Sequence, residues 1–310
     1  MSFAEHKIIH DSVHGSVRVD GVFLEILHRP EMQRLHGVKQ LGLAYLVFPG
    51  ANHTRFEHSL GAYHVAGLMS ASLGLDEEDR KAVLASALLH DLGHPPFSHT
   101  LEEVLENRFQ LDHMEMAVSL IRGERGVLRE GEREIIGRQG TLADLLDKSG
   151  ISTDAVCDII ASPGHKARRG QRLVLEPDGQ SHFNSHDHLN QMLHGPVDAD
   201  QMDYLLRDAH YTGVAHGIFD IDRLIHTIEL HHGDVVVRKN GMVAAEGLMV
   251  ARALMYTSVY FHKTVRIAEM MLCKAVEAAD ETIAEGLQMD NDASLIERLV
   301  AQGGRPRRLI

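Results

Sequence analysis

The chain has 310 residues, 44% of them hydrophobic, which is enough for one large packed domain or two modest ones. Its 31 Lys and Arg residues against 44 Asp and Glu give a formal net charge of −13, which argues against a protein that coats nucleic acid through a basic surface. The cysteine content, Cys157 and Cys273 alone, excludes a disulfide framework and a thiolate metal site. We find no signal-peptide core and no apolar run near the roughly 20 residues of a membrane helix, so we expect a cytoplasmic protein without a membrane partner.

The hydrophobic pattern predicts a mostly helical chain from its first third onward. Residues 1–20 alternate short apolar and polar groups around Gly15 and predict a small hairpin. Residues 22–121 carry apolar positions at helical spacing. The stretch 141–150 predicts a short helix, and 162–188 predicts an irregular loop.

The second half predicts more helices and one further hairpin. The helical pattern resumes at Leu189, and β-branched residues before Asn240-Gly241 predict a hairpin over 233–247. A single long helix is expected from Leu248 into the 280s. Because the sequence shows no internal repeat and no flexible linker, we expect a single domain over residues 1–310.

One short stretch, "ALLHDLGHPPFSHT", crowds three histidines and a carboxylate at the end of an apolar helix. Histidine is the commonest metal ligand and the usual acid–base group near neutral pH. His90 and Asp91 diverge by about 100° on an intact helix, but at a helix end both can reach one ion. Pro95-Pro96 is expected to stop the helix. The competing interpretation is that His90 and Asp91 only cap the helix end and face solvent in the turn.

Two other stretches carry polar groups at helical spacing. "NHTRFEHSLGAYH" places Arg55 and His58 three residues apart. "VDADQMDYLLRDAH" places Asp200, Tyr204 and Asp208 at i, i+4 and i+8, on one helix face. A solvated face is the competing interpretation of such a pattern. Together, His58, His90, Asp91 and Asp200 form a set of two imidazoles and two carboxylates.

This set suits one divalent ion such as Mn, Fe, Co, Ni, Zn or Mg, with coordination positions left for water and a phosphate oxygen. Such an ion can lower the pKa of water and polarise P–O bonds. The residues therefore indicate metal-dependent hydrolysis of a phosphate ester.

The strings "RFEHSLG", "HDLGHPPFSH" and "DADQMDYLLRDA", in this order, resemble the HD-domain phosphohydrolases, and more narrowly the deoxynucleoside triphosphate triphosphohydrolases. The resemblance extends from Lys7 to Val276. It implies an all-α HD-domain helical fold with small β-hairpins, a core metal site within about 22–210, and a pocket-closing hairpin and helix within about 233–285. It also implies one divalent metal ion per site and a homo-oligomer, and it leaves a nucleotide activator open.

The resemblance implies roles for individual residues around the metal and the phosphates. The implied metal ligands are His58, His90, Asp91 and Asp200. The implied catalytic group comprises His113 near the α-phosphate, Glu102 that orients it, and His94 and His99 around the phosphates. Pairing a carboxylate with an imidazole fixes the tautomer and supports proton transfer.

The resemblance also implies residues that bind the rest of the nucleotide. Arg55 matches a phosphate-side arginine, and Gln40 and Leu41 match residues beside the sugar. Asp208 matches the carboxylate that holds the 3′-hydroxyl, and Tyr204 the ring under the deoxyribose. The string "ARALMYTSVYFHKTVR" resembles the helix that closes the phosphate pocket, and its candidate residues are Arg252, Tyr256, Tyr260 and Lys263. An amphipathic surface helix is the competing interpretation.

One departure from the family pattern bears on the substrate. After Asp200 the family usually has Lys or Arg, whereas this chain has Gln201, which removes a point charge from the triphosphate. The predicted loop offers cations that could compensate or could simply be exposed: His165, Lys166, Arg168 and Arg169.

We therefore carry three hypotheses forward. The leading one is hydrolysis of dNTPs to deoxynucleoside and inorganic triphosphate. The second is a nucleotidase or cyclic-nucleotide phosphodiesterase on the same site, motivated by Gln201. The third is a nucleotide- or nucleic-acid-binding protein with a structural metal, supported by Arg168-Arg169 and the tail residues Arg305, Arg307 and Arg308. The acidic net charge counts against the third.

Overall fold

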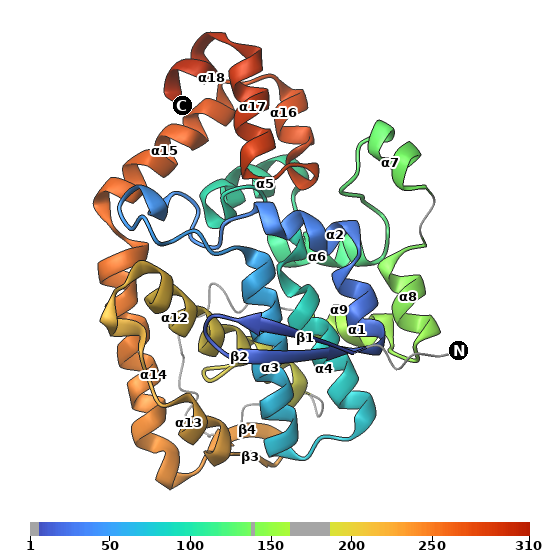
Figure 1. Cartoon of the computed structure of the whole chain (residues 1–310), viewed down its shortest axis with the longest axis vertical. Helices are drawn as coiled ribbons and strands as arrows, with labels where there is room; N and C mark the ends of the chain where they lie inside the picture. The colour runs from blue at the N-terminus through green and yellow to red at the C-terminus, as the bar shows by residue number, and fades with distance from the viewer. Residues whose placement is uncertain (1–5, 138–139, 162–186) are drawn as a thin grey trace, which may run out of the picture.

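The computed structural model describes residues 6–137, 140–161 and 187–310. Within these ranges the protein is mostly helical, with two small two-stranded antiparallel sheets, which confirms the predicted fold class (Figure 1). The loop predicted over 162–188 falls almost entirely outside the described residues.

The first hairpin is confirmed, and the second lies elsewhere than predicted. Strands β1 (His6–Asp11) and β2 (Gly15–Asp20) pair antiparallel, with Asp11 opposite Gly15. Strands β3 (Ile228–His231) and β4 (Asp234–Val237) form the second.

The prediction of that second hairpin around Asn240-Gly241 is wrong. The turn uses His232 and Gly233 instead, whose positive φ angles of 53° and 89° suit a tight two-residue turn. Asn240 and Gly241 lie in a 3₁₀ turn (Lys239–Gly241) that leads into the next helix.

Three helices position the polar residues of interest: α3 (Arg55–Leu73), α4 (Glu77–Leu89) and α12 (Ala199–Thr212). Helix α3 begins at a capping box of Thr54 and Glu57, and α12 begins at an Asp198 N-cap. Helices α3 and α4 contact each other at the centre of the molecule, and α12 packs on α3 (Figure 1).

The chain after α4 forms a compact turn, because the helix ends at Leu89, before the first histidine. A 3₁₀ turn (His90–Gly93) follows, then Pro95-Pro96, a second 3₁₀ turn (Ser98–Leu101) and helices α5 (Glu102–Phe109) and α6 (His113–Ile121). Gly93 permits α6 to approach, since a Cβ there would overlap the His113 carbonyl.

The long helix predicted from Leu248 into the 280s is wrong, because two helices and a wider turn take its place. Helix α14 (Met242–Met255) passes into a π-helical turn (Tyr256–Tyr260), and α15 (Lys263–Glu277) begins after the extended residue His262. A π-helical turn adds a residue to the helical repeat and often marks a functional position.

The remaining helices surround this centre, and α16 to α18 lie at the end of the molecule beside α5 (Figure 1). Their bounds are α1 Gly21–Leu27, α2 Pro30–Arg34, α7 Glu130–Ile136, α8 Leu142–Lys148, α9 Thr153–Ile160, α11 Asp187–His194, α13 Ile221–Thr227, α16 Glu281–Glu285, α17 Asp292–Gln302 and α18 Gly304–Leu309. One continuous apolar core joins Leu24 of α1, Leu84 of α4, Leu205 of α12 and Leu299 of α17.

Contrary to the sequence expectation, one helical stretch among the described residues, Lys239–Tyr260, is long and apolar enough by composition to cross a membrane. It carries Glu246 and Arg252, and its Leu248 and Met255 are fully buried in the core of the helical domain. About a quarter of its apolar window, 28%, is buried, and a single stretch of this kind is weak evidence for a membrane span.

Candidate metal and phosphate site

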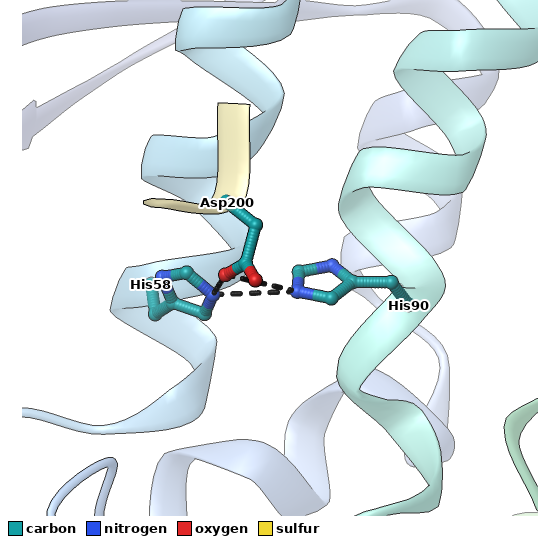
Figure 2. A group of neighbouring side chains, drawn as sticks. All are labelled: His58, His90 and Asp200. Carbon is teal, nitrogen blue, oxygen red and sulfur yellow. Dashed lines mark hydrogen bonds and ion pairs between the residues drawn. The ribbon is translucent and has the colours of Figure 1, made fainter. Parts of the chain in front are cut away.

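Three of the four predicted metal ligands converge on one point. His58 projects from α3, His90 from the start of the 3₁₀ turn that follows α4, and Asp200 from the first turn of α12 (Figure 2). The Nε2 atom of His58 lies 3.0 Å from an Asp200 carboxylate oxygen and 3.3 Å from Nε2 of His90. The same Asp200 oxygen lies 3.7 Å from Nε2 of His90. Three ligand atoms thus face a common point, as the binding of one cation requires.

Asp91, the fourth predicted ligand, borders this point and also contacts Arg55 and His94. Its two oxygens lie 3.5 Å from Nε2 of His58 and 3.4 Å from Nε2 of His90. One oxygen accepts a 2.6 Å hydrogen bond from Nη1 of Arg55, and the other lies 3.2 Å from Nε2 of His94. The fully buried guanidinium of Arg55 therefore fixes this carboxylate beside the two imidazoles.

The electrostatics of the group favour a positive charge at its centre. Burial lowers the pKa of His58, but hydrogen bonds to Asp200 and Asp203 outweigh burial and raise that pKa to about 10. Burial raises the pKa of Asp200, but His58 and His90 lower it below its usual range. A site that holds a proton this firmly also attracts a cation, and its two imidazoles and carboxylates suit a divalent transition metal or Mg²⁺.

A second layer of buried charges, which sequence reasoning missed, orients His58. Asp203 accepts 2.7 Å hydrogen bonds from Nδ1 of His58 and from Nε2 of His14, which lies in the β1–β2 turn. Arg207 donates two bonds to Asp203, at 2.8 and 2.9 Å, and one of 2.8 Å to Asp11. A carboxylate on the second nitrogen of a ligand histidine fixes its tautomer and orientation.

The close packing of this second layer depends on Gly61 of α3. A Cβ at Gly61 would overlap both the Asp203 carboxylate and the Arg207 guanidinium. A sequence signal was available, since Asp203 and Arg207 are four residues apart on α12.

The predicted phosphate-side histidines surround one carboxylate. Glu102 bonds to Nδ1 of His113 and, at 3.0 Å, to Nδ1 of His99. The rings of His94 and His113 stack with centroids 4.2 Å apart. Burial raises the pKa of Glu102, but these hydrogen bonds lower it far below its usual range. His113 is therefore held by an ionised carboxylate, as proton-transfer chemistry needs.

His94 differs from its neighbours, because it is buried beside positive groups. Burial, Arg55 and His113 lower the pKa of His94 well below its usual value. It is therefore a neutral hydrogen-bonding group at physiological pH. Ser98 accepts a 2.8 Å hydrogen bond from Nε of Arg55, which links that arginine to the following turn.

The predicted sugar-side carboxylate, Asp208, is held by two groups. Tyr260 of the π-helical turn donates a 2.6 Å hydrogen bond to it, and Nε2 of His53 lies 2.8 Å from its other oxygen. His53, fully buried and stacked on Tyr211, was missed by sequence reasoning because it precedes the motif in a loop. The Tyr204 ring lies 6.3 Å from that of Tyr260. Asp208, Tyr260, His53 and Tyr204 form one polar-aromatic cluster, and two of its members share α12 with Asp200 of the metal group.

The other residues predicted to bind substrate differ in how deeply they are buried and in what they contact. Gln40 is buried, and its backbone N–H donates to the carbonyl of His53; Leu41 packs against the core. Tyr256 contacts the Tyr260 ring edge-on. Lys263 is exposed and lines a groove between α15 and α18.

The structure shows what surrounds Gln201. Its amide donates to the carboxylate of Asp198 at 2.8 Å, and its amide oxygen accepts from Arg252 at 3.3 Å. Arg252 of α14 thus brings a cation next to the position where the family pattern has one. The loop cations proposed to compensate, His165, Lys166, Arg168 and Arg169, lie outside the described residues.

Two known protein families match this chain, and together they identify the kind of domain that carries the site. The HD domain matches residues 55–208, and the HD associated region matches residues 219–310. The chain belongs to the HD-domain phosphohydrolases. The resemblance inferred from the motifs is thereby confirmed. HD domains bind divalent metal ions, and this HD-domain phosphohydrolase brings His58, His90 and Asp200 together as such a group.

Relatives extend over most of the chain. YwfO of Bacillus subtilis, an uncharacterized protein, is 35% identical over 91% of this chain and 58% of its own length. The human deoxynucleoside triphosphate triphosphohydrolase SAMHD1 is 27% identical over 89% of this chain and 45% of its own length. This HD-domain phosphohydrolase therefore spans about half the length of the curated relatives it matches.

Solved structures show the same fold. The crystal structure of a hypothetical protein from Aquifex aeolicus matches with a TM-score of 0.76 at 35% identity, covering 98% of this chain and 74% of that one. A phosphohydrolase from Bacteroides thetaiotaomicron matches with a TM-score of 0.70 at 27% identity, covering 96% of this chain and 70% of that one.

Proposed function

We propose that this protein hydrolyses deoxynucleoside triphosphates to deoxynucleoside and inorganic triphosphate. The observation that carries the proposal is the set of contacts around the metal group. His94, 3.2 Å from Asp91, stacks on His113, which pairs with Glu102, whereas Asp208, which bonds to Tyr260, follows Asp200 on the same helix α12. The first pair suits phosphate chemistry, and the second suits a sugar hydroxyl. The 27% identity to the human triphosphohydrolase supports the same substrate class.

On the phosphate side, each residue has a distinct task. His58, His90, Asp91 and Asp200 would hold one divalent ion, which when bound supplies charge for a phosphate oxygen and a lowered pKa for water. Arg55 binds a phosphate oxygen through Nη2, which has no hydrogen-bond partner among the described residues. His113 moves a proton at Nε2, while Glu102 holds Nδ1. His94 and His99 line the phosphates.

On the sugar side, Asp208 accepts a hydrogen bond from the 3′-hydroxyl. The Tyr204 ring packs under the deoxyribose, where a 2′-hydroxyl would be crowded, and Gln40 and Leu41 lie beside the sugar. Arg252, Tyr256 and Tyr260 close the pocket from α14 and the π-helical turn, and Arg252 supplies the charge that Gln201 lacks. Lys263 is assigned to the phosphates by the resemblance alone.

Gln201 favours one alternative, a nucleotidase or cyclic-nucleotide phosphodiesterase on the same metal group. A neutral amide beside the metal suits a substrate with fewer phosphate charges. Nucleic-acid binding remains the weakest hypothesis because of the charge of −13. A cytoplasmic location, a homo-oligomer and a nucleotide activator also belong to the proposal and rest on the resemblance.

The test is incubation with each dNTP, singly and mixed, with Mn²⁺ or Mg²⁺, followed by separation of products by anion exchange. We expect inorganic triphosphate and deoxynucleoside in equal amounts, and neither product from Asp91→Ala. Turnover in mixtures alone would support the activator. Orthophosphate from a nucleoside monophosphate, without triphosphate from any dNTP, would replace this proposal by the alternative.

A further inference from the structure

Asp292, the first residue of α17, directs its side chain away from its own helix. It is 8% exposed, and the neighbouring residue Asn291 caps α17 by accepting a 3.0 Å hydrogen bond from the Ser294 N–H. The Asp292 carboxylate instead accepts a 2.7 Å hydrogen bond from the Phe97 N–H and a 3.1 Å bond from the Lys39 N–H. A side chain of the HD associated region thus contacts two segments that border the candidate site.

The backbone at the first of these segments needs external support. Phe97 and Ser98 have φ angles of 58° and 55°, a left-handed conformation that non-glycine residues adopt at an energetic cost. Such a conformation persists when surrounding contacts hold it. The bond from Phe97 to Asp292 is one of these contacts, and Arg34 adds bonds of 2.8 Å to the carbonyls of Leu92 and His94.

A chain of hydrogen bonds leads from these segments to the metal group. Ser98 donates a 2.6 Å bond to the Lys39 carbonyl and accepts a 2.8 Å bond from Nε of Arg55. Arg55 in turn holds Asp91 at 2.6 Å. Asp292 therefore fixes both backbone segments between which Ser98, and through it Arg55, is placed.

Burial disfavours the charge of the Asp292 carboxylate. Burial raises the pKa of its carboxyl to about 6, against the amides of Phe97 and Lys39 and the nearby cations of Lys39 and Arg34, which lower it. The ionised form is thus less favourable here than in water. An asparagine of the same shape would place an N–H₂ against one of the two amides and could accept a hydrogen bond only from the other.

We propose that Asp292 is a positioning residue of the candidate site, which sets Ser98 and Arg55 beside Asp91 by holding the backbone of Phe97 and Lys39. The inference rests on the proposed phosphohydrolase function of that site. It assigns to the associated region a role in the chemistry of the HD domain, beyond covering the core.

The test compares Asp292→Asn with Asp290→Asn. Asp290 is fully buried at the same junction and pairs with Arg129 and Arg298, but not with Phe97 or Lys39. We expect Asp292→Asn to lower kcat/KM about ten- to a hundredfold, as the loss of a charged hydrogen bond does, with a Tm change below about 3 °C. Asp290→Asn should lower Tm more, while kcat/KM well below Tm stays within about threefold of the wild type.

Two further measurements separate a positioning role of Asp292 from a role in fold stability alone. Hydrogen exchange at the Phe97 and Lys39 amides should accelerate in Asp292→Asn and not in Asp290→Asn. The double variant Asp292→Asn with Ser98→Ala should be no slower than the slower single variant, because both act through Arg55. Additive losses, equal losses in the Asp290 control, or faster exchange without loss of turnover would each overturn the inference.

Each variant is assayed on the dNTPs and on bis(p-nitrophenyl) phosphate with Mn²⁺. If the wild type cleaves the ester and no dNTP, the proposed triphosphohydrolase function fails while the positioning role is still measured on the ester. A wild type that cleaves neither compound would overturn both.

Discussion

The metal end and the sugar end of the site are built differently. At the metal end, His58, His90 and Asp200 come from elements of the matched HD domain. At the sugar end, Asp208 is held by Tyr260, which lies in the π-helical turn of the associated region. The boundary of the matched HD domain at residue 208 thus falls inside the candidate site. Residues 55–208 alone would leave that carboxylate without either partner, because His53 and Tyr260 both lie outside the match.

The two ends also differ in how their geometry is maintained. The His58 imidazole is fixed by buried charges on two elements, α12 and β1, because Asp203, Arg207 and Asp11 form one ion-paired chain. The sugar end relies on single hydrogen bonds and on ring contacts, and Tyr256 is 37% exposed. This difference predicts that changes at the metal end abolish the reaction, whereas changes at the sugar end alter substrate affinity.

The largest effect is expected from Asp200→Ala. It removes the carboxylate that faces both imidazoles, so bound Mn²⁺ should be lost and turnover should fall about a thousandfold or more, since a metal supplies several kcal/mol of charge stabilisation. Metal content after desalting and kcat measure this. The exposed Asp222→Asn on α13 is the matched control. Full metal content in Asp200→Ala would place the ion elsewhere.

An intermediate effect is expected from Asp203→Asn. The substitution removes the negative charge behind His58 and the ion pair between Asp203 and Arg207. Loss of such a second-layer carboxylate typically lowers metal affinity or activity about 10- to 100-fold. Titration with Mn²⁺ and kcat measure it. Unchanged affinity and turnover would show that His58 is oriented by its helix alone.

The smallest effect is expected from Tyr260→Phe. It removes one hydrogen bond to Asp208, so KM for a dNTP should rise by up to about tenfold, with Mn²⁺ affinity unchanged. Tyr63→Phe, a buried tyrosine packed on Phe23, is the control. A fall in metal affinity instead would mean that the two ends are not independent.

The sequence predicted much of the metal end because its residues lie in three continuous strings. The first hairpin and the face of α12 that carries Asp200, Tyr204 and Asp208 follow from local periodicity. The second hairpin was misplaced because the Asn-Gly pair is the stronger local turn signal, and His232-Gly233 forms the turn only through pairing of β3 with β4. Local patterns do not encode such competition between turns.

The missed residues share one property: their partners are distant in sequence. His53 reaches Asp208 across 155 positions, His14 reaches Asp203 across 189, and Asp292 reaches Phe97 across 195. Each contact forms only when separate elements pack together, so helical or strand periodicity carries no signal for it. The break between α14 and α15 has a similar origin, because the π-helical turn brings Tyr260 to Asp208.

The measurement that tests the central claim most directly is product analysis of dNTP hydrolysis by the Mn²⁺-loaded wild type, beside Asp91→Ala. We predict inorganic triphosphate and deoxynucleoside in a one-to-one ratio from the wild type and no products from the variant. Orthophosphate or pyrophosphate as the released ion, or equal turnover by the variant, would contradict the assignment of this site to triphosphate release.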